Sequence, residues 1–130
     1  MIRQGCLVLV AAWTTVGSAG AAGAPEALLA PYRTTGAGPF SADQGAAAWD
    51  RKTGTEGRSC ASCHGRDLTL PGRHLKTGKP IGPLSPSADP QRLSDARQVE
   101  KWLLRNCRWT WGRECTPQEK GDFLQYISSK

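Results

Sequence analysis

The chain has 130 residues and carries 17 Lys and Arg against 11 Asp and Glu, which gives a formal net charge of +6. This length suits one small domain, and no apolar run is long enough to span a bilayer, so we do not expect a membrane-spanning protein. Basic charge can indicate nucleic-acid binding, but the export signal and the cofactor motif described below argue against nucleic acid. The charge instead favours solubility and attraction toward an acidic redox partner.

The first 22 residues have the features of a secretory signal peptide. Arg3 supplies a positive charge, the apolar core runs from about Cys6 to Val16, and small residues up to Ala22 fit a cleavage site. We therefore expect an exported, soluble, periplasmic protein. The predicted organisation is a signal peptide at 1–22, an N-terminal extension with a short helix at 23–39, and one domain at 40–130.

Two helices are predicted before the cysteine motif. The segment 26–30 favours one or two helical turns, and Pro31 is expected to stop them. The sequence Ser41-Ala42-Asp43-Gln44 has the S-x-x-Q pattern of a capping box, which predicts the start of a second helix. This helix places Gly45 and Trp49 on one face, four residues apart.

The sequence Cys60-Ala61-Ser62-Cys63-His64 is a C-x-x-C-H motif, the attachment pattern of c-type haem. Two thiols at this spacing can each form a thioether bond with one porphyrin, and the adjacent imidazole of His64 can ligate the iron from the proximal side. A thioredoxin-like redox pair needs a βαβ context that the chain lacks. A zinc site with Cys107 and Cys115 as further ligands needs an unusually wide second pair. We therefore expect one covalent haem c, and 40–130 is predicted to be a monohaem cytochrome domain.

The segment after His64 is rich in Pro and Gly, which excludes a long helix or a central strand up to about residue 93. Scattered apolar residues, Leu84 among them, favour a loop that wraps around the haem and is ordered by it. Four side chains in this loop have two interpretations, as partners of the haem propionates or as solvated charges. They are Arg73, His74, Lys76 and Lys79.

Two further helices are predicted in the C-terminal part. One begins near Ser94-Asp95, and residues at helical spacing share one of its faces: Val99, Trp102, Leu103 and Asn106. The other begins with the capping box Thr116-Pro117-Gln118-Glu119. Trp109 and Trp111 fall in the expected loop between these helices. No convincing strand is present, so the predicted fold class is all-α with long loops. We expect the haem pocket to be lined by Leu84, Trp102 and Leu103.

Cysteine counting leaves one pair outside the haem motif. Cys6 is expected to leave with the signal peptide, so Cys107 and Cys115 remain in an oxidising compartment, where a disulfide is the default state. Two free, buried thiols are the alternative. On the chain-entropy model, closing so short a loop stabilises the folded chain by about 2.5 kcal/mol.

Elimination reduces the number of candidates for the ligand on the distal side of the iron. The only methionine is Met1, so the methionine ligation that raises the potential of many cytochromes c is excluded. His74 is the only other histidine, and the chain between it and His64 is long enough to reach around the ring. The remaining candidates are an amide, a lysine, a water molecule or no ligand at all. Among amides Asn106 is the candidate, because it is a polar residue on an apolar helical face. A weak amide ligand would leave on reduction and open the ferrous site to O2, NO or CO.

Two blocks of the sequence closely resemble the sphaeroides haem protein family, small exported oxygen-binding cytochromes c with an asparagine distal ligand. The blocks are Val99-Glu100-Lys101-Trp102-Leu103-Leu104-Arg105-Asn106-Cys107 and Gly112-Arg113-Glu114-Cys115-Thr116-Pro117-Gln118-Glu119-Lys120. The segments 77–87 and 89–95 also look like the family. The resemblance implies the class I cytochrome c fold, in which the helix of Gly45 and Trp49 crosses the helix of Phe123 and Tyr126.

The resemblance also implies roles for individual residues. Cys60 and Cys63 attach the haem, His64 is the proximal ligand, and Asn106 is the distal ligand of ferric iron that is lost on reduction. A disulfide joins Cys107 to Cys115. Family members are associated with a di-haem cytochrome c and a membrane cytochrome b as electron donors. The expected function is electron transfer with binding of a diatomic gas, which could extend to oxygen reduction or nitric oxide detoxification. His74 departs from the family pattern, and it keeps open the alternative of a closed, bis-histidine electron carrier.

Overall fold

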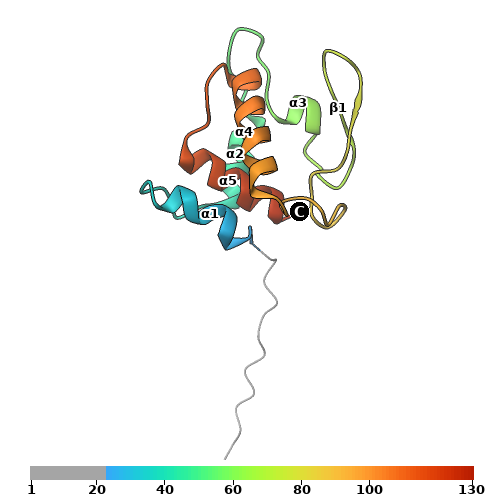
Figure 1. The fold of residues 1–130 in the computed structure, drawn as a ribbon. Coiled ribbons are helices and arrows are strands. Elements are labelled where there is room, and N and C mark those ends of the chain that lie inside the picture. The colour runs from blue at the N-terminus through green and yellow to red at the C-terminus, as the bar shows by residue number, and fades with distance from the viewer. Residues whose placement is uncertain (1–22) are drawn as a thin grey trace, which may run out of the picture.

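Within residues 23–130, which the computed structural model describes, the chain forms five helices and two very short strands (Figure 1). They are α1 (Glu26–Arg33), α2 (Ala42–Asp50), α3 (Ala61–His64), β1 (Gly72–Arg73), β2 (Pro80–Ile81), α4 (Ala96–Trp111) and α5 (Pro117–Ser128). The predicted all-α class is confirmed, because the strands are only two residues each. The expected signal peptide at 1–22, including Cys6, lies outside the described residues.

The central contact of the fold is the crossing of α2 and α5. A Cβ atom added to Gly45 would lie 2.1 Å from the backbone oxygen of Asp122 and 2.7 Å from the Cβ atom of Tyr126. Only glycine therefore permits this approach. Trp49, on the same face of α2, packs against Phe123 with ring centroids 5.9 Å apart, and both side chains are buried. The predicted crossing of these two helices is confirmed.

The helix starts follow the predicted capping patterns. The Ser41 hydroxyl accepts a hydrogen bond from the backbone N–H of Gln44 at the start of α2. At the start of α5, Thr116 and Glu119 form a complete capping box, in which each side chain accepts a hydrogen bond from the other residue's backbone N–H. Both interactions satisfy donors that the first helical turn leaves without intrahelical partners.

The first helix differs from the prediction, because α1 continues through Pro31 to Arg33. A proline removes one backbone donor from a helix and leaves one carbonyl without its partner. Pro31 is exposed, so water can solvate that carbonyl. The last turn is held instead by Tyr32, which is buried with Leu29 against Leu124 of α5.

The fourth helix is longer than predicted, and it includes Trp109 and Trp111, which were expected in a loop. The chain offers no helix breaker before Gly112, which adopts a left-handed conformation (φ 69°) and donates its N–H to the carbonyl of Arg108. At the other end, the Asp95 carboxylate caps the first turn through the N–H groups of Arg97 and Gln98.

The expectation of no strand is also corrected. β1 and β2 pair in antiparallel register, with Gly72 opposite Ile81 and Arg73 opposite Pro80. The turn between them closes because Gly78, at φ 67°, donates its N–H to the carbonyl of His74. Pairing this short has no period-2 signal in the sequence, so pattern analysis does not detect it.

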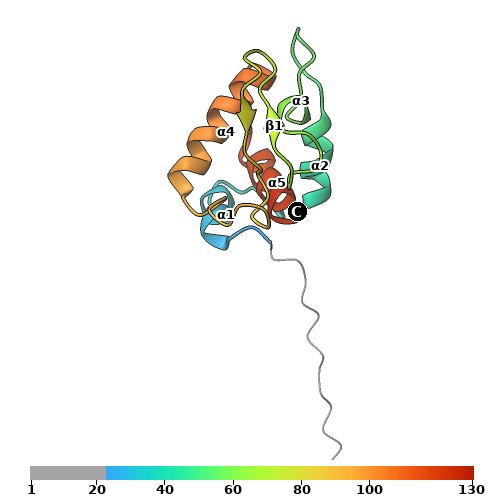
Figure 2. The same ribbon diagram turned by 90° about the vertical axis from the view of Figure 1, so that its right-hand side faces the viewer.

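The buried apolar residues of the described chain form two separate clusters. Figure 2 shows α4 on one side and α2 with α3 on the other, with the β1–β2 hairpin between them and α1 and α5 at one end. The hydrophobic core lies where α2 and α5 meet and includes Trp49, Leu68 and Phe123. Among residues 23–130, no helix is long and apolar enough to cross a membrane.

Candidate functional site

The single turn of α3 presents the C-x-x-C-H motif as one rigid unit. The backbone N–H groups of Cys63 and His64 both donate to the carbonyl of Cys60, at 3.3 and 3.1 Å. The hydroxyl of Ser62 accepts the N–H of Ser59 at 3.1 Å and anchors the start of the turn. Because residues three apart on a helical turn share a face, both free thiols lie on the same side of α3.

The β1–β2 hairpin holds this turn from the other side. A Cβ atom on Gly72 would lie 2.2 Å from the carbonyl oxygen of Cys63 and 2.9 Å from the Cα atom of His64, so glycine is required for the contact. The N–H of Leu75 donates to the Sγ atom of Cys63 at 3.4 Å. Burial raises the pKa of the Cys60 thiol to about 12, so this sulfur stays protonated and does not behave as an exposed reactive thiolate.

A cavity of about 1320 Å³ lies between α3, α4 and the loop from 77 to 95. The structure brings all the predicted haem-pocket and iron-ligand residues to its walls. Cys60, Cys63 and His64 line it from the motif, and Trp102, Leu103 and Asn106 line it from α4. Leu84 and His74 line it from the segments between them. Residues separated by more than forty positions in the sequence therefore face one common space.

His64 is half-buried on the wall of this cavity that α2 supports. Its ring lies 5.6 Å from the ring of Trp49, and the indole N–H of Trp49 donates to the carbonyl of Gly65 at 2.8 Å. Burial, with a smaller effect of the positive charge on Arg92, lowers the pKa of His64 to about 4. The imidazole is therefore neutral at pH 7, which is the form that ligates metals. Its Nδ1 atom is buried and finds no hydrogen-bond partner among residues 23–130.

Asn106 faces the same cavity from α4. Its side chain is exposed rather than buried, which differs from the expectation drawn from the apolar face around it. Leu103 is half-buried, and Trp102 keeps 49% of its surface exposed at the cavity wall. Asn106 is thus a neutral amide placed among apolar side chains.

His74 reaches the cavity from the turn of the hairpin. Its Nδ1 atom accepts the backbone N–H of Thr77 at 3.2 Å, and its ring lies 5.4 Å from the ring of Trp109 on α4. When Nδ1 accepts a hydrogen bond, the neutral imidazole carries its proton on Nε2. In that tautomer Nε2 is a hydrogen-bond donor.

The four-thiolate zinc alternative does not match the cysteine pairing in the structure. In residues 23–130, no group of three or more His, Cys, Asp or Glu side chains could hold a metal ion. Cys107 and Cys115 are paired with each other and are not turned toward Cys60 and Cys63. The cavity therefore has one cysteine pair available for a cofactor.

Comparison with known proteins agrees with this geometry. A family model described as a domain of unknown function, DUF1924, matches residues 35–127. The cytochrome c-type protein SHP of Cereibacter sphaeroides is 44% identical over 110 residues, which cover 82% of this chain and 84% of SHP. The chain belongs to the sphaeroides haem protein family.

Solved structures extend the comparison to the fold. The structure of oxidised SHP, described as an oxygen-binding cytochrome c, matches with a TM-score of 0.74 and 42% identity over 81% of this chain and 96% of SHP. Oxidised cytochrome c'' of Methylophilus methylotrophus matches with a TM-score of 0.68 and 30% identity over 78% of this chain and 90% of that one. The predicted class I cytochrome c fold is thereby confirmed.

Membership of the sphaeroides haem protein family makes this chain a monohaem c-type cytochrome, and its cofactor is one covalently bound haem c. The cavity fits this group in two respects. Two free thiols and a neutral imidazole lie together on one wall. The remaining walls are mostly apolar, with Leu84 and Leu103 among them. The orphaned Nδ1 of His64 fits less simply, because metal-ligating histidines usually donate from their second nitrogen.

More basic side chains line the cavity than the two of the four predicted propionate partners that reach it. Of the four side chains considered as propionate partners, His74 and Lys79 line the cavity, whereas Arg73 and Lys76 do not. Arg92, Arg105 and Arg108 also line it and were missed. Arg105 follows Trp102 by three residues on α4, so helical spacing could have indicated it. Arg92 lies in a loop, where no periodicity could have placed it.

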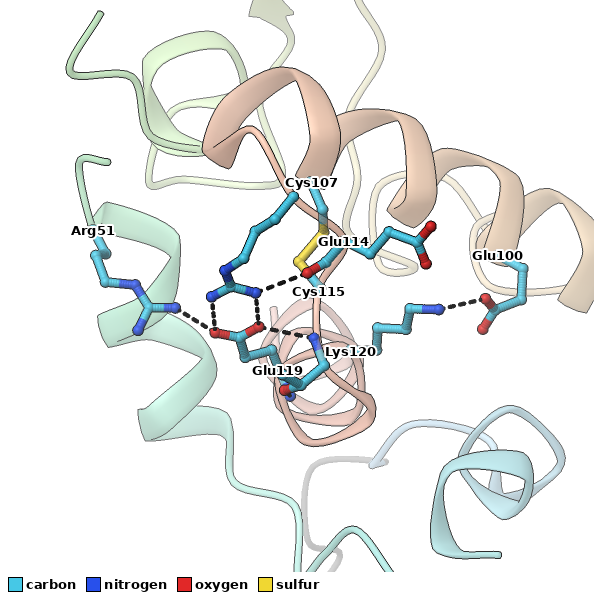
Figure 3. Close-up of a disulfide and its surroundings, with 9 residues drawn as sticks. Arg51, Glu100, Cys107, Glu114, Cys115, Glu119 and Lys120 are labelled. Atoms are coloured by element: carbon cyan, nitrogen blue, oxygen red, sulfur yellow. Dashed lines mark hydrogen bonds and ion pairs between the residues drawn. A yellow bond between two sulfur atoms is a disulfide. The ribbon is translucent and has the colours of Figure 1, made fainter. Parts of the chain in front are cut away.

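The second cysteine pair joins the end of α4 to the start of α5 (Figure 3). Cys107 and Cys115 form a disulfide with their Cα atoms 5.6 Å apart, and both are buried. Beside them, both carboxylate oxygens of Glu119 accept hydrogen bonds from Arg113 at 2.8 Å, and Arg51 of α2 donates to the same carboxylate. The hydrogen bonds from Arg113 are the main cause that lowers the pKa of Glu119 to about 2. This cluster fixes the C-terminal end of α4, one turn from Asn106.

Proposed function

We propose that the protein is an exported cytochrome that transfers electrons and, when reduced, binds a diatomic gas such as O2 or NO after a weak asparagine ligand leaves the iron. The haem supplies a reversible one-electron couple and an axial position at which such a gas can bind. Cys60 and Cys63 are the proposed attachment residues, His64 the proximal ligand and Asn106 the distal ligand of the ferric state. The proposal also includes the disulfide between Cys107 and Cys115 as a native bond.

One observation carries the gas-binding part of this proposal. His64 and Asn106 line one cavity from different elements, α3 and α4, and Asn106 follows Trp102 and Leu103 at helical spacing on the cavity side of α4. A carboxamide oxygen is a hard and weak donor that tolerates ferric iron better than ferrous iron. Reduction therefore weakens this ligand, while the neutral imidazole of His64 stays in place. The oxygen binding stated for the related SHP supports the same function.

The alternative function is a closed electron carrier in which His74 takes the distal position. His74 lines the cavity, which favours this alternative. The hydrogen bond from Thr77 to its Nδ1 and its contact with Trp109 argue for a donor role at Nε2 instead.

The proposed cellular location and electron donors follow from the sequence and from the family. The N-terminal 22 residues fit a signal peptide, which supports a periplasmic location. A di-haem cytochrome c and a membrane cytochrome b are the proposed electron donors. The net charge of +6 favours an acidic docking face on such a donor. Oxygen reduction or nitric oxide detoxification would additionally need a proton donor near the gas.

Substitutions at Asn106 test the distal assignment. We expect Asn106→Ala to convert the ferric absorption spectrum from low-spin to high-spin, because the sixth ligand is gone. Asn106→His supplies a strong nitrogen ligand from the same position, so we expect the reduced protein to stay low-spin and to bind CO at least about tenfold more slowly, because the open form becomes a minor state. Both spectra are recorded on the purified holoprotein.

His74→Ala is the matched control for these variants. It removes the competing candidate from the same cavity, and we expect its ferric spectrum to equal that of the wild type. A low-spin ferric spectrum in Asn106→Ala, together with conversion to high-spin in His74→Ala, contradicts the Asn106 assignment and supports the electron-carrier alternative.

A further inference from the structure

The row of α4 residues that line the cavity continues beyond Asn106. Val99, Leu103 and Asn106 follow one another at helical spacing along the cavity, and the next residue on this face is Thr110, which also lines it. Residues four apart on a helix have their Cβ atoms about 5–6 Å apart, so Thr110 lies one turn beyond Asn106. Only 7% of the Thr110 surface is exposed, so a hydroxyl group is held in a protected position beside the distal candidate.

The Thr110 hydroxyl lacks the hydrogen bond that threonines near a helix end usually make. A threonine in a helix commonly donates to a backbone carbonyl three or four residues earlier. Thr34 and Thr35 do so with the carbonyls of Pro31 and Tyr32, both at 2.7 Å. Among the described residues, the Thr110 hydroxyl has no such bond. The Thr110 oxygen is also not among the buried atoms without a partner, so it remains accessible, and because Thr110 lines the cavity a partner can approach it from there.

The environment of Thr110 makes its hydroxyl a good donor. Cys107, on the preceding turn, is buried in the disulfide, so this end of α4 is fixed. The loop before the haem motif covers the backbone of Thr110, since a Cβ atom on Gly54 would lie 3.8 Å from its carbonyl oxygen. A hydrogen bond is stronger where water and mobile side chains are excluded.

We propose that the Thr110 hydroxyl donates a hydrogen bond to the diatomic gas that occupies the distal side after Asn106 has left, and so selects for O2 over CO. This inference rests on the proposed gas-binding function. A donor stabilises O2 more than CO, because O2 draws electron density toward itself when it binds to ferrous iron and CO does so less. Thr110 thereby becomes a residue that determines which gas is retained.

Thr110→Val tests the inference, because valine keeps the shape of threonine and removes only the hydroxyl. In the reduced holoprotein we expect O2 to dissociate about tenfold faster, as loss of one hydrogen bond predicts. CO should dissociate within about twofold of the wild-type rate, and the C–O stretching frequency of the CO complex should rise. Thr110→Ser restores the hydroxyl and should restore the wild-type frequency and rates.

One control variant and the wild-type protein separate the outcomes. Thr53→Val removes a buried hydroxyl outside the cavity and should leave the frequency and both rates unchanged. Unchanged O2 dissociation and an unchanged C–O frequency in Thr110→Val overturn the inference. A change in the ferric spectrum alone also overturns it, because Thr110 would then act on Asn106 and not on the gas. A wild-type protein that binds no CO when reduced overturns the gas-binding function itself, whatever the variants do.

Discussion

We expect the double substitution Cys60→Ala, Cys63→Ala to abolish covalent haem attachment. The two thiols are the free cysteines of the described chain, and both lie on the cavity wall beside His64. Without thioether bonds the haem is held by ligation and apolar contacts alone. The measurement is peroxidase staining of a denaturing gel together with extraction into acidified organic solvent. We expect no stained band and full extraction of any bound haem.

The loss of haem should also remove folded structure. The cavity measures about 1320 Å³, and the apolar face of α4 is turned toward it. Without the haem, water would enter this space and contact apolar side chains that the cofactor otherwise covers, and this exposure is unfavourable. We expect the far-ultraviolet circular dichroism of the variant to lose most of its helical signal.

The matched control removes the other cysteine pair. Cys107→Ser, Cys115→Ser breaks the disulfide between α4 and α5 but leaves the C-x-x-C-H motif intact. This variant should retain the stained band and be less stable by about 2.5 kcal/mol. A stained band in the Cys60→Ala, Cys63→Ala protein would contradict the assignment of the attachment residues.

The second large effect is expected for Gly45→Ala, which places a methyl group at the crossing of α2 and α5. The new Cβ atom would lie 2.1 Å from the carbonyl oxygen and 2.7 Å from the carbonyl carbon of Asp122. These are backbone atoms within a helix, so they cannot rotate away, and the two helices must separate. Alanine also raises helix propensity by about 1 kcal/mol, which offsets part of the cost.

We expect a net loss of about 3 kcal/mol in the free energy of unfolding of the holoprotein, at the upper end of the usual overpacking cost. For a domain of this size that loss corresponds to a fall in Tm of about 15 °C. Ala47→Ser is the control, at an exposed position of the same helix, and it should stay within about 0.5 kcal/mol of the wild type. An unchanged Tm in Gly45→Ala would mean that α2 and α5 do not approach as closely as described.

Capping patterns and helical periodicity predicted the parts of the fold that depend on residues close together in the sequence. The helix starts at Ser41 and Thr116 depend on a capping pattern within four residues, and both were correct. The position of Asn106 among apolar residues followed from the helical period of α4. The approach of α2 to α5 could not be deduced from spacing, because the reason for Gly45 is a backbone atom of Asp122 on a distant segment.

The parts that were missed depend on contacts distant in sequence. The helix α1 survives Pro31 because Tyr32 and Leu29 pack against α5. The β1–β2 pair exists because Gly72 fits against the backbone of Cys63. His74 was identified as a candidate ligand from composition alone, and only its bond with Thr77 indicates which of its nitrogens carries the proton. The site residues were predicted correctly as neighbours, whereas their roles at the iron stay predictions.

The most direct measurement is the absorption spectrum of the anaerobically reduced wild-type protein before and after addition of CO. If Asn106 leaves the iron on reduction, the reduced spectrum is high-spin and CO converts it at once. A sharp low-spin spectrum that CO does not change would contradict gas binding at an open ferrous site. It would identify a strong ligand that persists in the reduced state, with His74 as the candidate, and the protein would be an electron carrier only.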